Sequence, residues 1–112
     1  MTWDEVCRLT LALPGTEVST SYGSPALKVR GKLIAWLRDG GDTLVVKVDF
    51  EERLALTHSD PETFFVTDHY LNYPMVLVRL ARVDPEELRE LLIEAWLLTA
   101  PRKLVMEYEA SL

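Results

Sequence analysis

The spacing of apolar residues changes along the chain, and the changes predict an order of helices and strands. Apolar residues recur every three or four positions near the amino terminus, alternate with polar residues from about residue 26, and return to helical spacing after residue 84. This pattern predicts one helix, a meander of three strands, a short helix, two strands and two further helices. The expected ranges are 2–13, 26–30, 33–38, 43–48, 50–57, 63–66, 75–80, 85–100 and 102–110.

Residues with strong local preferences mark where these elements begin. Thr2 and Asp49 each precede a glutamate by three residues, which is the capping-box pattern of a helix start. Asp84 followed by Pro85 is a third helix start, while segment 15–25 is expected to be a connecting loop. The elements together predict an α+β fold of two layers. Helices from both ends of the chain cover one face of an antiparallel sheet of about five strands.

Length and composition indicate the number of domains and the cellular compartment. A chain of 112 residues that is 48% hydrophobic is expected to form a single domain, 1–112. The single cysteine, Cys7, excludes an intrachain disulfide and a site built from several thiolates, which fits a reducing compartment. With no signal-like segment and no long uncharged apolar run, we expect a cytoplasmic protein without membrane contact. A monomer and a weak dimer both stay open.

Charge is distributed unevenly between the predicted strands and helices. Alternation places these side chains on the sheet face that the helices leave open: Lys28, Arg30, Trp36, Arg38, Lys47 and Arg79. The acids that give a net charge of -6 gather instead in predicted helices and turns. A basic face around a tryptophan suits DNA or another polyanion, because cations neutralise phosphates and an indole stacks on bases. The same pattern is also typical of a solvated sheet face that needs charge to remain soluble.

The chain contains no recognisable catalytic constellation. Cys7, His58 and His69 do not have the spacing of metal ligands, and Cys7 is expected to be a buried apolar residue of the first helix. The glycine-rich stretches lack the strand, turn and helix context of a phosphate-binding loop. These observations predict a protein that is not an enzyme and that uses no metal or cofactor.

Segment 67–74, with the sequence TDHYLNYP, combines a histidine with two tyrosines. Pro74 restricts Tyr73 to extended conformations, so the segment is expected to be a shaped entry into the next strand, with a role in packing. His69, Tyr70 and Tyr73 nevertheless remain candidates for lining a pocket between segment 61–74 and the sheet.

Three stretches of the chain resemble the YjbR/MmcQ family. They are LPGTEVSTSYGSPALKVRGKLIAWL at 13–37, ETFFVTDHYLNYPMVLVRL at 62–80 and DPEELRELLIEAWLLTAPRKLV at 84–105. The resemblance implies a frataxin-like (CyaY-like) α+β domain and DNA binding through a double-wing surface. The turns at 30–32 and 38–42 would be the wings, and the residues on or beside them are Lys28, Arg30, Lys32, Arg38 and Lys47. Iron binding is not implied, because the first helix carries only two acids.

The leading hypothesis is therefore a binding module without catalytic activity. Its expected nucleic-acid contacts are Lys28, Arg30, Lys32, Trp36, Arg38, Lys47 and Arg79. The alternative is a domain that binds a small ligand or a protein through His69, Tyr70 and Tyr73.

Overall fold

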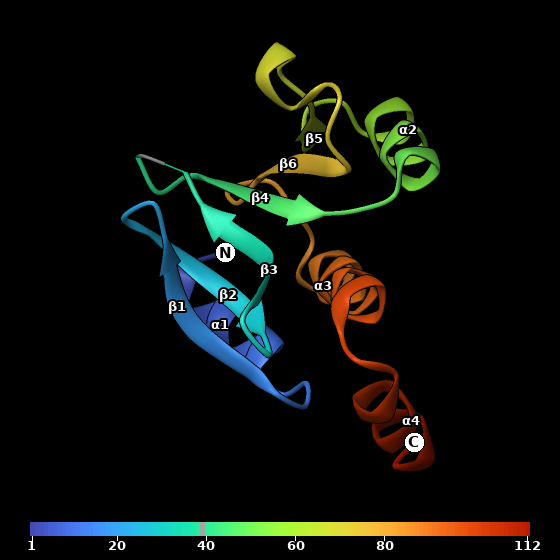
Figure 1. The fold of residues 1–112 in the computed structure, drawn as a ribbon. Coiled ribbons are helices and arrows are strands. Elements are labelled where there is room, and N and C mark those ends of the chain that lie inside the picture. Colours follow the sequence, from blue (N-terminus) through green and yellow to red (C-terminus); the bar gives the residue numbers. More distant parts are fainter. Residues whose placement is uncertain (39) are drawn as a thin grey trace.

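The computed structural model describes residues 1–38 and 40–112; Asp39, in the predicted turn at 38–42, lies outside them. The described residues form four helices, one 3-10 turn and six strands (Figure 1). In chain order they are α1 (Trp3–Leu11), β1 (Thr16–Ser21), β2 (Ser24–Val29), β3 (Lys32–Leu37), β4 (Thr43–Lys47), α2 (Phe50–Ser59), β5 (Phe64–Phe65), η1 (Asp68–Tyr70), β6 (Met75–Arg79), α3 (Pro85–Thr99) and α4 (Arg102–Ala110).

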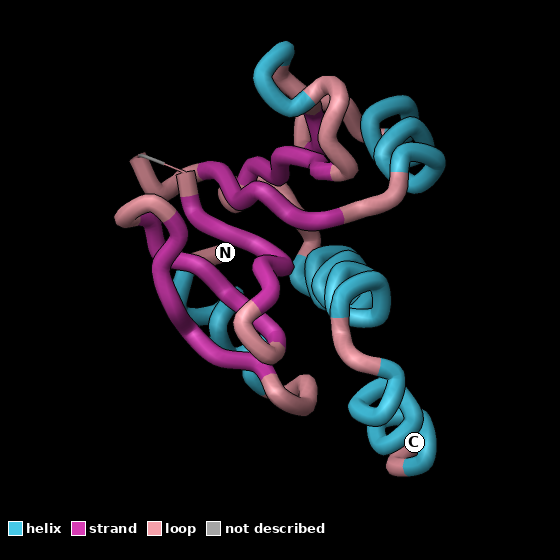
Figure 2. The backbone as a smooth tube through the Cα atoms, in the orientation of Figure 1, coloured by secondary structure: helices cyan, strands magenta, loops and turns pink. Residues whose placement is uncertain are grey.

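The six strands form one antiparallel sheet in the order β1-β2-β3-β4-β6-β5 (Figure 2). This confirms the predicted α+β class. The strand count was too low by one, because the segment expected to be a loop forms β1 and pairs with β2 along its whole length. Its sequence, TEVSTS, is almost entirely polar, and its one apolar residue, Val18, is half exposed. β1 is an edge strand defined by backbone pairing, so it lacks the apolar alternation on which the prediction relied.

The helices cover one face of the sheet. α3 packs across β3 and β4, α1 packs beside α3 and β1, and α2 lies against β5 and β6. The core between the layers contains fully buried residues from every inner strand, including Val29, Ile34, Leu44, Val46 and Val78. Trp96 of α3 is buried among them and donates a hydrogen bond from Nε1 to the carbonyl of Pro14 at 2.9 Å, so its one polar group is satisfied.

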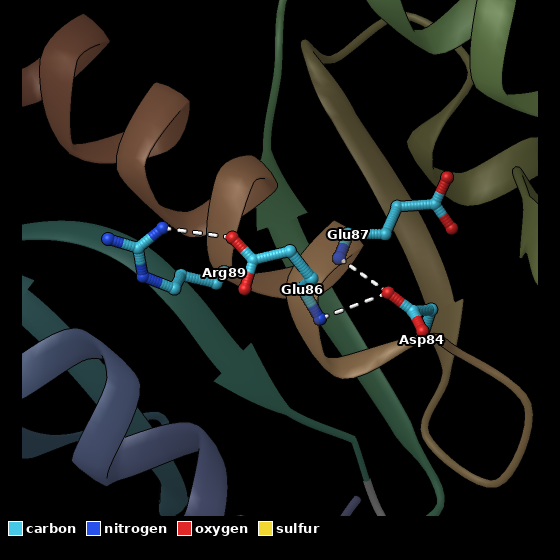
Figure 3. Close-up of polar contacts among 4 residues, drawn as sticks. All are labelled: Asp84, Glu86, Glu87 and Arg89. Atoms are coloured by element: carbon cyan, nitrogen blue, oxygen red, sulfur yellow. Dashed lines mark hydrogen bonds and ion pairs between the residues drawn. The ribbon is translucent and has the colours of Figure 1, made fainter.

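The predicted capping residues begin three of the helices. Thr2 forms a reciprocal capping box with Glu5, and the Asp49 side chain accepts a hydrogen bond from the Glu52 amide at 2.8 Å. The Asp84 carboxylate accepts from two backbone amides at the start of α3, both at 3.1 Å (Figure 3). The end of α2 differs from the prediction, because the helix continues to Ser59 instead of stopping at 57.

Candidate functional site

The second sheet face, meaning the face turned away from the helices, is defined by the strand register. Cross-strand partners point to the same side of a sheet. The pairings therefore place a central row on this face, which consists of Ala26, Trp36, Val45, Leu77 and Phe65. Ala26, Val45 and Leu77 are fully buried. The expectation of an open face is therefore wrong for its centre, where small and aliphatic residues are shielded by their larger neighbours.

Part of this shield is an aromatic cluster formed by Trp36, His69 and Tyr70. Tyr70 belongs to η1, and its ring centroid lies 6.0 Å from that of Trp36 at an interplanar angle of 54°. The His69 ring meets Tyr70 edge-on at 4.7 Å. Trp36 is half-buried, whereas His69 is exposed. The structure therefore joins residues that the sequence had assigned to two different candidate sites.

Tyr73, the third residue of the predicted pocket, is 58% exposed and has no ring contact with these aromatics. Two surface hollows of the described residues are lined entirely by residues outside segment 61–74. Neither hollow therefore corresponds to the predicted pocket of His69, Tyr70 and Tyr73.

Arg53 of α2 holds the segment that carries Tyr70. Its guanidinium donates to the carbonyls of Tyr70 at 3.2 Å, Leu71 at 2.9 Å, Tyr73 at 2.9 Å and Met75 at 3.3 Å. A planar group with five donors is suited to several carbonyls that converge on one point. Sequence reasoning missed this residue, because its partners are 17 to 22 positions away and no local pattern connects them.

Basic residues lie on the second sheet face on both sides of the central row. Lys28 pairs with Leu33, and Lys47 pairs with Met75, which places both at one end of the sheet. Arg79 pairs with Thr43 at the other end. Arg38, which follows β3, lies at the same end as Arg79, because its amide donates to the carbonyl of Thr43, the partner of Arg79, at 2.9 Å. Four of the predicted basic residues therefore flank the aromatic cluster, two at each end.

Neither Arg30 nor Lys32 lies on this face. Alternation predicted Arg30 there, which is wrong, whereas Lys32 was expected on or beside the turn at 30–32, where it begins β3. Arg30 occupies the turn between β2 and β3 with a positive φ of 49°, and its amide donates to the Gly15 carbonyl at 3.3 Å. Lys32 pairs with Val29, whose side chain faces the core, and so begins its strand on the helix side. Alternation fails here because a hairpin turn reverses the chain between the two residues.

The two predicted wings lie at opposite ends of the sheet, since successive turns of a meander alternate ends. The turn beside 38–42 is instead the one between β1 and β2, at the upper left of Figure 1. Its residue Tyr22 is fully exposed and has a φ of 48°, a left-handed conformation that favours glycine. The turns at 30–32 and 38–42 therefore do not meet at one end of the sheet.

The basic residues differ in how far they are already engaged. The Arg79 guanidinium lies 4.0 Å from the centre of the Phe65 ring and donates to the Glu62 carbonyl at 3.0 Å. Lys28 has Glu17 of β1 as its cross-strand neighbour. This acid was not expected on the face, because segment 15–25 was predicted to be a loop. Among the described residues, Lys28, Arg38 and Lys47 form no ion pair within 4.0 Å. With respect to the described part of the chain, these three side chains retain their hydrogen-bonding capacity for a ligand.

Neither a metal centre nor an activated thiol emerges from the described residues. Across 1–38 and 40–112, no three histidine, cysteine or acidic side chains converge on a point that would hold a metal ion. Burial and the charge of Asp4 raise the pKa of the Cys7 thiol, which disfavours the nucleophilic thiolate. The same residues include no helix long and apolar enough to cross a membrane.

Comparison with known proteins places the chain in a family. Residues 11–98 match the family model YjbR. Uncharacterised proteins of Mycobacterium tuberculosis and Mycobacterium bovis are 35% identical over 128 residues, which cover 98% of this chain and 97% of theirs. The crystal structure of Deinococcus radiodurans protein DR2400, of family-model domain DUF419, superposes with a TM-score of 0.75 at 25% identity, over 87% of this chain and 77% of that one. The chain belongs to the YjbR family.

Proposed function

We propose that this protein is a binding module for nucleic acid and that single-stranded DNA or RNA lies along the second sheet face. The observation that carries the proposal is the arrangement of Lys28 and Lys47 at one end and Arg38 and Arg79 at the other, with the aromatic cluster between them. Cations at two ends of a stacking surface are the combination that sequence-tolerant single-strand binders use.

The dimensions of the face agree with such a ligand. Thr43 and Lys47 mark the two basic ends on β4, and four residues of strand span about 13 Å at a rise of roughly 3.3 Å each. Each strand of duplex DNA has a phosphate about every 3.4 Å of helix axis, so roughly four phosphates of a helically stacked strand, and fewer of an extended one, fit this length. The bases of such a strand would then lie over Tyr70 and the exposed His69 ring.

The wing geometry favours a single strand over a duplex as the ligand. A double wing would need two basic turns at the same end of the sheet. The turn beside 38–42 carries Tyr22 and Gly23 and no basic residue. The basic residues instead follow the sheet face, where an unpaired strand can expose its bases to aromatic rings.

Charge reversal with a matched control tests this proposal. Lys28→Glu with Lys47→Glu changes the net charge by -4, and Arg102→Glu with Lys103→Glu makes the same change on the exposed start of α4. Binding of fluorescein-labelled single-stranded and duplex oligonucleotides would be followed by anisotropy at low salt. We expect the sheet-face variant to bind single strands at least about tenfold more weakly and the α4 variant to stay within about threefold.

A second variant tests the stacking part of the proposal. Tyr70→Ala leaves every basic residue in place, and a lost base contact of about 1–3 kcal/mol corresponds to a roughly fivefold to hundredfold weaker complex. Circular dichroism would verify that each variant remains folded. The proposal is wrong if no oligonucleotide binds at low salt, or if both charge-reversed variants lose affinity equally.

A further inference from the structure

A groove with a hollow of about 380 Å³ lies between α2 and α3, in the helix layer and away from the second sheet face. Its floor is apolar and includes Val48, Leu56 and Leu91, all buried residues of the core. Leu98, near the end of α3, also lines it and is 48% exposed. The groove thus offers an apolar strip between two helices that no other part of the described chain occupies.

The rim of this groove is acidic throughout. Five carboxylates line it: Asp49, Glu52, Glu87, Glu90 and Glu94. No basic residue lines it. Loss of solvent contact, followed by the charges of Asp60, Asp84 and Glu90, raises the pKa of Glu87 above its ordinary range.

The arginines of the two flanking helices are committed elsewhere. Arg53 of α2 is bonded to the carbonyls of segment 70–75, and Arg89 of α3 pairs with Glu86 at 3.1 Å. Figure 3 shows that the Glu86–Arg89 pair and the Glu87 side chain point in opposite directions from α3. The described residues therefore supply no counterion to the groove, and its charge is available to a cationic partner.

We propose that this groove docks an amphipathic helix of a partner protein, with lysines or arginines flanking an apolar stripe. Leucine-like side chains of the partner would contact the floor at Leu56, Leu91 and Leu98, and its cations would meet the acidic rim. A helix laid into an apolar groove between two helices is a recurrent mode of peptide recognition, read through anchors at helical spacing. Complementary charge on the rim would set the orientation and the rate of association.

A second copy of the chain is a poorer occupant. The chain's own helix with adjacent cations is α4, which starts with Arg102 and Lys103. Its apolar side is already used, since Leu104 is buried and the Tyr108 ring packs on Trp96 at 5.2 Å. The proposed partner is therefore a different protein, and the site is independent of the nucleic-acid face on the other side of the sheet.

The test uses synthetic peptides as probes and the whole chain as receptor. The first probe has leucine and lysine at helical spacing over about 14 residues, which form a helix roughly 20 Å long. Its control has the same composition in an order that abolishes the leucine stripe. Calorimetry measures affinity, and amide chemical shifts locate the peptide. We expect the striped peptide to bind and to shift the signals of Leu56, Leu91 and Leu98, and the scrambled peptide to bind at least about tenfold more weakly.

Variants of the chain distinguish binding in the groove from a general attraction of the peptide to an acidic protein. Glu90→Lys with Glu94→Lys changes the net charge by +4 at the groove, and Glu107→Lys with Glu109→Lys makes the same change on α4. We expect the groove variant to bind the striped peptide at least about tenfold more weakly and the α4 variant to stay within about twofold. Leu98→Ser should also weaken binding, because it removes an exposed apolar contact without opening the core. Equal effects of the two charge variants, equal binding of both peptides, or self-association through the groove would each overturn the proposal.

Discussion

Replacing Arg53 by alanine should release segment 68–75 from α2. The side chain makes four hydrogen bonds to backbone carbonyls, two of them partly buried and two exposed. If each partly buried bond contributes about 1 kcal/mol and each exposed bond about half as much, the loss is about 3 kcal/mol. For a domain of this size, such a loss lowers the melting temperature by roughly 10 °C or more.

The effect should be largest near the released carbonyls, because the segment can detach while the core stays folded. Backbone bonds within it, such as Tyr70 N–H to Thr67 and Tyr73 N–H to Tyr70, both at 3.0 Å, depend on the same geometry. Hydrogen exchange at the amides of Tyr70 and Tyr73 should therefore speed up by about a hundredfold, as 3 kcal/mol requires. Urea unfolding monitored by circular dichroism measures the global part of the loss.

Two further variants test whether donor geometry is the cause. Arg53→Lys keeps the charge but replaces a planar fork by a single ammonium, so we expect it to lose about half as much stability as Arg53→Ala. Arg89→Ala removes a helix cation whose one ion pair is exposed and should cost less than about 0.5 kcal/mol. An Arg53→Ala variant that unfolds within about 0.5 kcal/mol of the parent, with unchanged exchange at Tyr73, would refute the reasoning.

Two further predictions concern a close approach and a helix cap. Gly15→Ala should destabilise more than Gly23→Ala in matched urea titrations: both have positive φ, but a Cβ at Gly15 would lie 2.6 Å from Leu104, whereas at Gly23 nothing lies within 4 Å. Equal losses would show that backbone strain alone matters. Hydrogen bonds from Thr2, first from its backbone and then from its side chain, lower the pKa of Glu5 below the usual 4.5. The stabilisation by the Glu5 carboxylate is therefore fully present above pH 4.5 and is lost as the pH falls through the lower pKa of the folded state. Glu5→Gln should therefore be less stable than the parent at neutral pH and equal to it at the acid end; a pH-independent difference would contradict this.

The helices and inner strands were predictable because their own residues show the pattern of each structure. Buried residues recur at helical spacing in α3, β4 is a short apolar run that is buried on both faces, and caps such as Thr2 and Asp84 act on amides two or three residues away. β1 was not predictable in the same way. It is an edge strand defined by its pairing with β2, and none of its side chains is buried.

The candidate site was predictable only as far as strand parity extends. Alternation correctly placed Lys28, Lys47 and Arg79 on one face, and it failed at Arg30, where the chain turns. The contact between Trp36 and Tyr70 joins two elements that are distant in sequence, and it depends on the bonds from Arg53. Such contacts arise from the packing of the whole chain, so no local sequence pattern predicts them.

The separation of the two charged surfaces decides how much the net charge of -6 opposes nucleic-acid binding. The shortest dimension of the molecule is 26 Å, and the acidic groove and the basic face lie on opposite sides of the sheet. The screening length is about 8 Å at 0.15 M salt and between about 10 and 30 Å at tenfold lower salt. The groove variant Glu90→Lys with Glu94→Lys should thus strengthen oligonucleotide binding in dilute buffer and leave it unchanged at 0.15 M. Anisotropy titrations at the two salt concentrations measure this difference. An increase that persists at the higher salt would mean that the oligonucleotide contacts the groove itself, contrary to the division of the protein into a basic sheet face and an acidic helix layer.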